Sequence, residues 1–471
     1  MSGSGTSPLR GLRSGQLGTA DVTASTVANI GPGIDFYFGF GVVAVTAGIG
    51  APLTILAAAL AVFLLAMGVA EFSRTEPSSG SFIEFVESGL GPVAGVATAV
   101  LVAVGYTIAM AGVFTMSGGF IAITLAHYGV ADVAWGPLTV VITLAALALM
   151  VRGIRLSTSA VAGAVVLQVA IMVVACALIL VDHRGDLTGA PFHWSAVTGG
   201  LRGLSAGFPL ALYMFIGWEN GPALAEECRE PRTTVPRALM ASIAIATVLF
   251  LLFAYATVTG FGYDVSSIGR SSIPFLTVAD RALGPFAVVA WLAGIVSVLA
   301  TLVSGSNSQS RMLYDAGRTG KLPRWLGEVR PSSQTPARAL TAFVVVALGV
   351  IAVWALVHAV GVGTGSMDPV GLYAECSTLG TIVILFVYVL TMASLPVYAW
   401  RRHRDRFSVV RHVVLPLLGT AALAVPFVTL CTPGQPSPYD AFPFVALGVV
   451  VAAFVAGRVV VARRRRASGP A

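Results

Sequence analysis

The chain has 471 residues, of which 56% are hydrophobic and only 10% are charged, and its mean hydropathy is +0.87. This balance excludes a soluble globular protein of the same length, because such a protein needs far more polar surface. The sequence contains no Gly-rich phosphate-binding loop of the Lys-Ser/Thr type, so it predicts no ATP-driven machine.

Apolar stretches long enough to cross about 30 Å of hydrocarbon, which takes roughly 20 helical residues, recur along nearly the whole chain. We predict an all-α polytopic membrane protein with twelve transmembrane helices, and such long single-helix runs exclude a β-barrel. The first helix follows a polar stretch and has no signal-peptide cleavage site, so we expect it to be retained. The approximate ranges are 21–47, 51–73, 92–126, 135–151, 157–181, 198–227, 237–261, 285–312, 338–360, 370–396, 411–431 and 441–462.

Basic residues predict the orientation of these helices. With both termini in the cytoplasm, 24 of the 28 Lys and Arg residues fall on the cytoplasmic side and four fall outside, namely Arg184, Arg202, Arg270 and Arg281. The positive-inside rule therefore predicts cytoplasmic termini in a plasma-membrane protein, and it accounts for the net charge of +7 without nucleic acid.

Polar segments divide the chain into one membrane domain and two tails. The predicted organisation is a flexible cytoplasmic tail at 1–19, a ten-helix transport core at 20–396 with repeats at about 20–183 and 196–396, a loop with helices eleven and twelve at 397–462, and a basic cytoplasmic tail at 463–471.

The four cysteines and six histidines show no metal-ligand spacing, so we predict no metal and no cofactor.

The first predicted helix contains a helix-breaking cluster, Asn29-Ile-Gly31-Pro32-Gly33-Ile-Asp35. Pro32 has no N–H to donate to the carbonyl of Ala28, and glycines tolerate unwound backbone dihedrals. A break inside a bilayer needs a cavity or protein groups that satisfy the freed backbone. We therefore expect two half-helices that meet near the middle of the membrane.

The sixth predicted helix has a comparable interruption, Tyr213-Met-Phe215-Ile-Gly217-Trp-Glu219-Asn-Gly-Pro222. Broken helices in the first and sixth positions indicate two inverted repeats of five helices, with the binding site between them and two peripheral helices at the end. The alternative is that Gly and Pro simply kink transmembrane helices, where both are common. The carboxylate in each cluster favours a functional break.

Three segments carry a resemblance to a known family. They are Glu71-Phe-Ser-Arg-Thr-Glu-Pro77-Ser-Ser-Gly80-Ser-Phe, the run from Gly217 through Glu226-Glu227 and Pro231 to Pro236-Arg237-Ala-Leu, and Arg311-Met-Leu-Tyr-Asp-Ala-Gly-Arg-Thr-Gly320-Lys-Leu-Pro323 continuing to Thr335-Pro336-Ala-Arg338. In this order the segments resemble the amino acid–polyamine–organocation (APC) superfamily of permeases. The resemblance implies the leucine-transporter-like fold, with substrate held at the breaks of helices one and six.

The substrate site implied by this resemblance agrees with the helix physics. The N–H groups of Gly33 and Ile34 open a half-helix and would face a substrate carboxylate, while carbonyls at Ala28 and Asn29 would accept from its ammonium. The family has Phe where this chain has Asp35, which points to a cationic group on the substrate, although Asp35 is also placed to cap the half-helix. The candidate substrate-binding residues are Ala28, Asn29, Ile30, Gly31, Gly33, Ile34, Asp35, Tyr213, Phe215 and Gly217.

Three further residues are candidates for coupling. Glu219 lies where relatives carry a carboxylate linked to protons, and a carboxylate inside a span costs roughly 2.5–3.5 kcal/mol on insertion scales, which marks it as functional; its alternative role is to hold the broken backbone. Thr301 and Ser304 match hydroxyl ligands of sodium-coupled relatives, but such hydroxyls also bond to their own helix. Tyr213 and Phe215 resemble an aromatic gate, with core packing as the alternative.

The sequence thus predicts a secondary transporter, and no enzyme, for an amino acid or organic amine. Its partners would be this small molecule, the lipid bilayer, and a proton or a counter-substrate, with the oligomeric state left open. A non-transporting sensor or a channel on the same fold is the alternative, since a fold does not fix a function.

Overall fold

The computed structural model describes residue 15 and residues 17–75, 81–152, 158–330, 335–359, 368–431 and 437–467. Within these ranges the regular structure is helical, with two isolated bridges and no strand. Most of the predicted tail 1–19, the segment Pro77–Gly80 of the first family motif and residues 468–471 lie outside the described residues. The α-helices are α1 (Thr19–Ile30), α2 (Pro32–Ala47), α3 (Ala51–Thr75), α4 (Ser81–Leu90), α5 (Pro92–His127), α6 (Trp135–Val151), α7 (Thr158–Asp182), α8 (Leu201–Tyr213), α9 (Asn220–Ala223), α10 (Pro231–Gly260), α11 (Val265–Arg270), α12 (Pro274–Leu283), α13 (Ala287–Arg318), α14 (Ala337–Ala359), α15 (Pro369–Arg402), α16 (Leu415–Leu430) and α17 (Phe442–Ala467).

Length and composition identify the membrane-crossing segments. Eight helical segments of the described residues are long and apolar enough to cross a bilayer. The shorter apolar helices Trp135–Val151 and Val410–Ala424 lie in two of the other predicted ranges. The protein is therefore a multi-pass helical membrane protein, as the composition predicts.

The centre of the bundle is formed by α5 and α15, which pack along each other. Their close approach depends on small residues, since a Cβ on Gly380 would lie 2.6 Å from the backbone nitrogen of Ala109. Small residues at helix interfaces are the usual device for close packing in membranes, where burial of apolar surface gives no drive between helices. The broken helices α2 and α8 pack against α15, whereas α1 packs mainly against α10, with α13 and α7 beside it.

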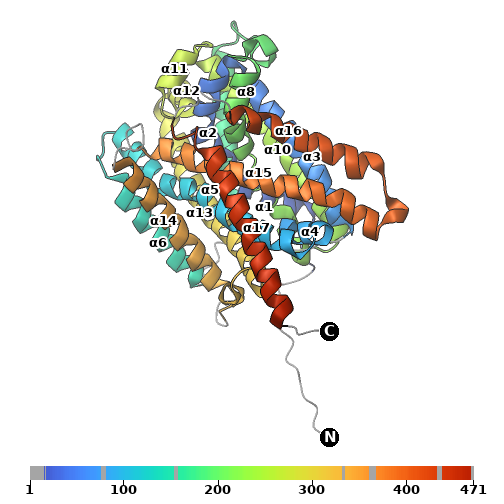
Figure 1. Cartoon of the computed structure of the whole chain (residues 1–471). Helices are drawn as coiled ribbons and strands as arrows, with labels where there is room; N and C mark the ends of the chain where they lie inside the picture. Colours follow the sequence, from blue (N-terminus) through green and yellow to red (C-terminus); the bar gives the residue numbers. More distant parts are fainter. Residues whose placement is uncertain are drawn as a thin grey trace.

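The two ends of the bundle differ in structure. The short helices α11 and α12 cover one end, and the C-terminal end of α17 lies at the opposite end (Figure 1). Helix α17 continues to Ala467, so its last turn contains part of the basic segment predicted as a tail. This places the arginines of α17 on a helix rather than in an extended segment.

Candidate functional site

The first predicted break lies at a single residue. Helix α1 ends at Ile30, Gly31 adopts a left-handed conformation (φ 67°, ψ 55°), and α2 starts at Pro32. The Gly31 N–H donates to the Val27 carbonyl (3.2 Å), and the Gly31 carbonyl accepts from the Asp35 N–H (3.2 Å). Glycine at a helix end and proline at the first helical position each suit such a junction. The N–H groups of Gly33 and Ile34 then lie in the first turn of α2, where a helix has no acceptor of its own for them.

Helix α13 packs against this break through Thr301. A Cβ on Gly31 would lie 2.6 Å from the Thr301 hydroxyl oxygen, so the hydroxyl lies directly beside the unwound residue. The Ser304 hydroxyl instead donates to the Thr301 carbonyl (3.4 Å), within its own helix. The two candidate cation ligands thus differ, because one faces the break and the other is bonded locally.

Helix α7 contributes a residue that the sequence reasoning missed. The Gln168 amide lies so close to Gly33 that a Cβ there would come within 1.3 Å of the Gln168 Nε2 atom. Gln168 is buried, and neither its Nε2 nor its Oε1 atom has a hydrogen-bond partner among the described residues. An unpaired buried amide is costly, so this side chain calls for a polar partner that the described residues do not supply. A lone amide in an otherwise apolar helix was the signal available in the sequence.

Asp35 lies in the first turn of α2 and points toward α15. Its carboxylate accepts a hydrogen bond from the Tyr373 hydroxyl (3.0 Å), and both side chains are buried. Tyr213, the last residue of α8, stands edge-on to the Tyr373 ring with centroids 5.8 Å apart. Its hydroxyl donates to the Ala109 carbonyl (3.5 Å). Asp35 therefore belongs to a polar cluster with two tyrosines, while Gly31 occupies the capping position of α2 and no side-chain cap bond is formed.

The second predicted break is longer. Helix α8 ends at Tyr213 and α9 begins at Asn220, with turns between them. Gly217 has φ 110°, and a Cβ on it would lie 2.6 Å from the backbone oxygen of Asn29. The Asn29 side-chain amide donates to the Gly217 carbonyl (3.2 Å). The two breaks, 188 residues apart in the sequence, are therefore in direct contact.

Glu219 holds the second break from within. One carboxylate oxygen accepts from the Gly217 N–H (3.0 Å), and the other accepts from the Tyr106 hydroxyl of α5. Trp218, which precedes Glu219, donates from its indole nitrogen to the Tyr388 hydroxyl of α15 (3.2 Å). Tyr106 and Tyr373 were not selected from the sequence, because single tyrosines in apolar helices are common packing residues.

The remaining predicted residues line the breaks without polar contacts. Phe215 is fully buried and stands edge-on to Phe250 of α10, with centroids 5.2 Å apart. This contact joins Phe215 to a cluster of aromatic rings that includes Phe36. Ala28, Ile30 and Ile34 are buried at the first break.

The sequence is similar to known membrane transporters over most of its length. A family model described as "Amino acid permease" matches residues 17–454. The branched-chain amino acid permease of Bacillus subtilis is 26% identical over 349 residues, covering 68% of this chain and 71% of that protein. The methylthioribose transporter of the same organism is also 26% identical, covering 71% and 74%. The D-serine/D-alanine/glycine transporter of Escherichia coli K12 is 28% identical over 206 residues, covering 43% and 41%.

A solved structure shares the fold at much lower sequence identity. A crystal structure of a mutant of the Eremococcus coleocola manganese transporter superposes with a TM-score of 0.55 and 12% identity, covering 98% of this chain and 99% of that one. At this identity the likeness concerns the fold alone. It extends over nearly the whole of both chains.

Proposed function

The chain belongs to the amino acid permease family, a family of membrane transporters rather than enzymes, and we propose that it is a secondary active transporter for an amino acid or organic amine. In this proposal the substrate binds where the break between α1 and α2 meets the break between α8 and α9. Access to that site alternates between the two sides of the membrane. Proton coupling or exchange drives the cycle.

We infer the arrangement of the transport core from the same two breaks. The proposal is twelve transmembrane helices, with ten of them forming two inverted repeats of five at about 20–183 and 196–396. The broken segments lie in the first and sixth predicted ranges, which are corresponding positions in such repeats. Their contact through Gly217 and Asn29 supports a site between the repeats.

The main support for a substrate site at these breaks is a set of unpaired polar groups that border them. Among the described residues, Asn29 Oδ1 and both polar atoms of Gln168 are buried without hydrogen-bond partners. The first-turn N–H groups of α2 lie beside Gln168 and supply the positive end of a helix dipole. A small substrate with donors and acceptors would satisfy such groups.

Asp35 sets the proposed substrate class. Its carboxylate is held by Tyr373 in a buried setting, where an ionic contact with an ammonium is stronger than in water. The substrate would be an amine with little acid character, or a cationic amino acid that reaches Asp35 with its side chain. Two of the relatives are named for amino acids and one is named for methylthioribose, a thiosugar. Membership of the family therefore does not by itself identify the substrate.

Purified protein in liposomes provides the test of this function. The protein is offered radiolabelled neutral, acidic and cationic amino acids and simple amines, with and without a pH gradient or an internal counter-substrate. We expect saturable uptake of at least one amine or cationic amino acid, stimulated by one of the two gradients. Binding without uptake or exchange under every condition would instead favour a non-transporting sensor on this fold.

The orientation of the protein is proposed from its charges. Both termini would face the cytoplasm, and the loop at 262–284 would face outside the plasma membrane. An impermeant maleimide should label Ser272→Cys from outside and Ser333→Cys only after permeabilisation, where Ser333 lies outside the described residues. Both variants are made in a Cys431→Ser background, because Cys431 is the exposed native cysteine of the described residues. Labelling of both positions from outside would contradict the orientation.

A further inference from the structure

A cavity of about 500 Å³ lies at the C-terminal end of α17, and none of its lining residues belongs to the proposed substrate site. Its wall is formed by the end of α13, the turn that follows it, the 3-10 turn Arg324–Gly327 and the last turns of α17. Four of its seven lining residues are arginines and none is acidic. The lining residues are Arg318, Thr319, Gly320, Arg324, Val460, Arg463 and Arg464.

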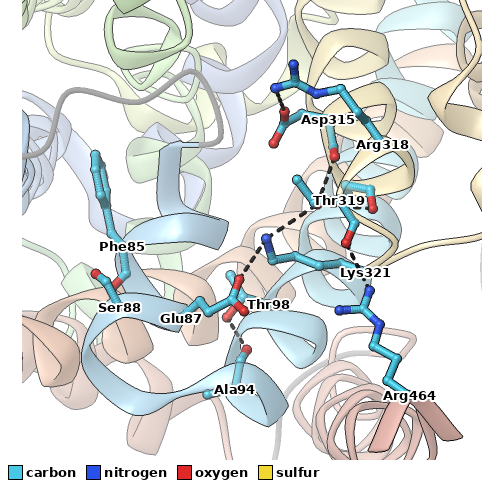
Figure 2. A network of polar contacts seen from close by, with 11 residues as sticks. Phe85, Glu87, Ser88, Ala94, Thr98, Asp315, Arg318, Thr319, Lys321 and Arg464 are labelled. Carbon is cyan, nitrogen blue, oxygen red and sulfur yellow. Dashed lines mark hydrogen bonds and ion pairs between the residues drawn. The ribbon is translucent and has the colours of Figure 1, made fainter. Parts of the chain in front are cut away.

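The cavity wall is held together by specific contacts. Arg464 donates to the Thr319 carbonyl (3.0 Å) and packs on Gly320, whose added Cβ would lie 2.7 Å from the Arg464 guanidinium. Lys321, the single lysine of the sequence, is buried and joins Thr319 to Glu87 of α4 by contacts of 3.3 and 2.7 Å. Figure 2 shows this chain of contacts from α4 through the end of α13 to α17. Arg464 of α17 is therefore held against the turn that follows α13.

The position of the cavity along α17 identifies the surroundings of a ligand. Val451, Val455 and Val459 are exposed and recur every four residues, so they form one apolar stripe of α17. The stripe ends where Arg463 enters the cavity. Trp325, exposed beside Arg324, is the residue type that prefers the membrane–water interface. The cavity thus lies at the level where lipid acyl chains give way to phosphate head groups.

We propose that this cavity binds a phosphate-bearing anion, supplied by an anionic phospholipid of the adjacent leaflet. Guanidinium groups bind phosphate oxygens through paired, charge-assisted hydrogen bonds, and several arginines around one cavity match this chemistry. Basic pockets between transmembrane helices are a known setting for anionic head groups. The acyl chains of the phospholipid would lie along the valine stripe. A free phosphate ion has the same phosphate oxygens but no acyl chains, so it would use the arginines alone.

The test uses the full-length protein purified in detergent, with bound lipid measured by native mass spectrometry. Phosphatidylglycerol and phosphatidylcholine are titrated separately, and inorganic phosphate is titrated against bound phosphatidylglycerol. We expect one phosphatidylglycerol to be retained in preference to phosphatidylcholine. The double variant Arg324→Gln, Arg463→Gln should bind it about 30-fold more weakly, from roughly 1 kcal/mol for each arginine.

The matched control is Arg458→Gln, Arg466→Gln, which removes the same charge from arginines of α17 that do not line the cavity. It should retain phosphatidylglycerol binding far better than the cavity variant. Arg324→Lys, Arg463→Lys keeps the charge and should lie between them. Equal losses in the two Gln variants, or no preference over phosphatidylcholine, would overturn the site. Saturation by inorganic phosphate in protein that retains no phosphatidylglycerol would overturn the lipid source.

Discussion

The break between α1 and α2 and the break between α8 and α9 satisfy their backbone groups in different ways. The first is one residue long and consists of Gly31 followed by Pro32 at the start of α2. Its carboxylate, Asp35, accepts a hydrogen bond from the side chain of Tyr373. The second spans several residues, and its carboxylate, Glu219, accepts directly from the backbone N–H of Gly217. Asp35 is thus bonded to a side chain of another helix, whereas Glu219 is bonded to the backbone of its own break.

The two breaks also differ in which atoms lie next to their glycines. Gly217 faces the backbone of Asn29, which cannot rotate away. Gly33 faces the end of the Gln168 side chain, which can.

Gly217→Ala should be the most damaging change. Its φ of 110° is strained for any residue with a Cβ, and the new atom would overlap the Asn29 carbonyl, so we expect the free energy of unfolding to fall by about 2–6 kcal/mol. The measurement is thermal unfolding of the purified protein in detergent. Gly349→Ala is the control, since a Cβ there meets no atom within 4 Å. Equal stability of the two variants would show that the breaks do not depend on each other.

Asp35→Asn should reduce affinity for cationic substrates without a comparable loss of stability. The amide oxygen can still accept from Tyr373, but the charge is lost, and a hydrogen bond to a charged group contributes about 1.5–3 kcal/mol, or about 10- to 150-fold in affinity. Substrate KM in liposomes measures the effect. Tyr373→Phe keeps the charge and removes only the hydroxyl, so its loss should be smaller. Unchanged KM for every transported cation in Asp35→Asn would reject the recognition role.

Gly33→Ala should have an intermediate effect that depends on Gln168. The new methyl group would displace the amide from the first turn of α2, and we expect uptake to fall about tenfold, equivalent to about 1.4 kcal/mol. In Gly33→Ala, Gln168→Ala the clash is gone, so Gly33→Ala should cost much less in the Gln168→Ala background. Initial uptake rates of the four proteins form a double-mutant cycle. Additive effects would mean that Gln168 does not act through this contact.

Sequence reasoning located both breaks because Gly and Pro determine backbone conformation locally. It also placed Thr301 beside the first break, through resemblance, and the structure finds its hydroxyl next to Gly31. It did not find Gln168, Tyr106 or Tyr373, because their roles arise only when α7, α5 and α15 are packed around the breaks. Nor could it separate Ser304 from Thr301, since the direction of a hydroxyl on a helix depends on its neighbours.

Glu219→Gln should have the smallest effect on the fold and a selective effect on coupling. The Gln side-chain oxygen can still accept from the Gly217 N–H, and its amide can donate to the Tyr106 oxygen, so the second break keeps its contacts. What the variant loses is the ability to gain and release a proton. If Glu219 carries the coupled proton inward, wild-type uptake rises as the outside is acidified, whereas uptake by the variant stays level across the same pH range.

Two comparisons isolate this effect. Glu375→Gln changes a carboxylate of α15 that contacts Trp354, away from both breaks, and should keep the wild-type pH response. Glu219→Ala removes both hydrogen bonds and leaves the buried Gly217 N–H without its acceptor, so it should lower stability by about 1–3 kcal/mol in addition. A pH response in Glu219→Gln that matches the wild type would assign Glu219 to the backbone of the break alone. The two carboxylates would then differ completely, one acting on substrate and the other on structure.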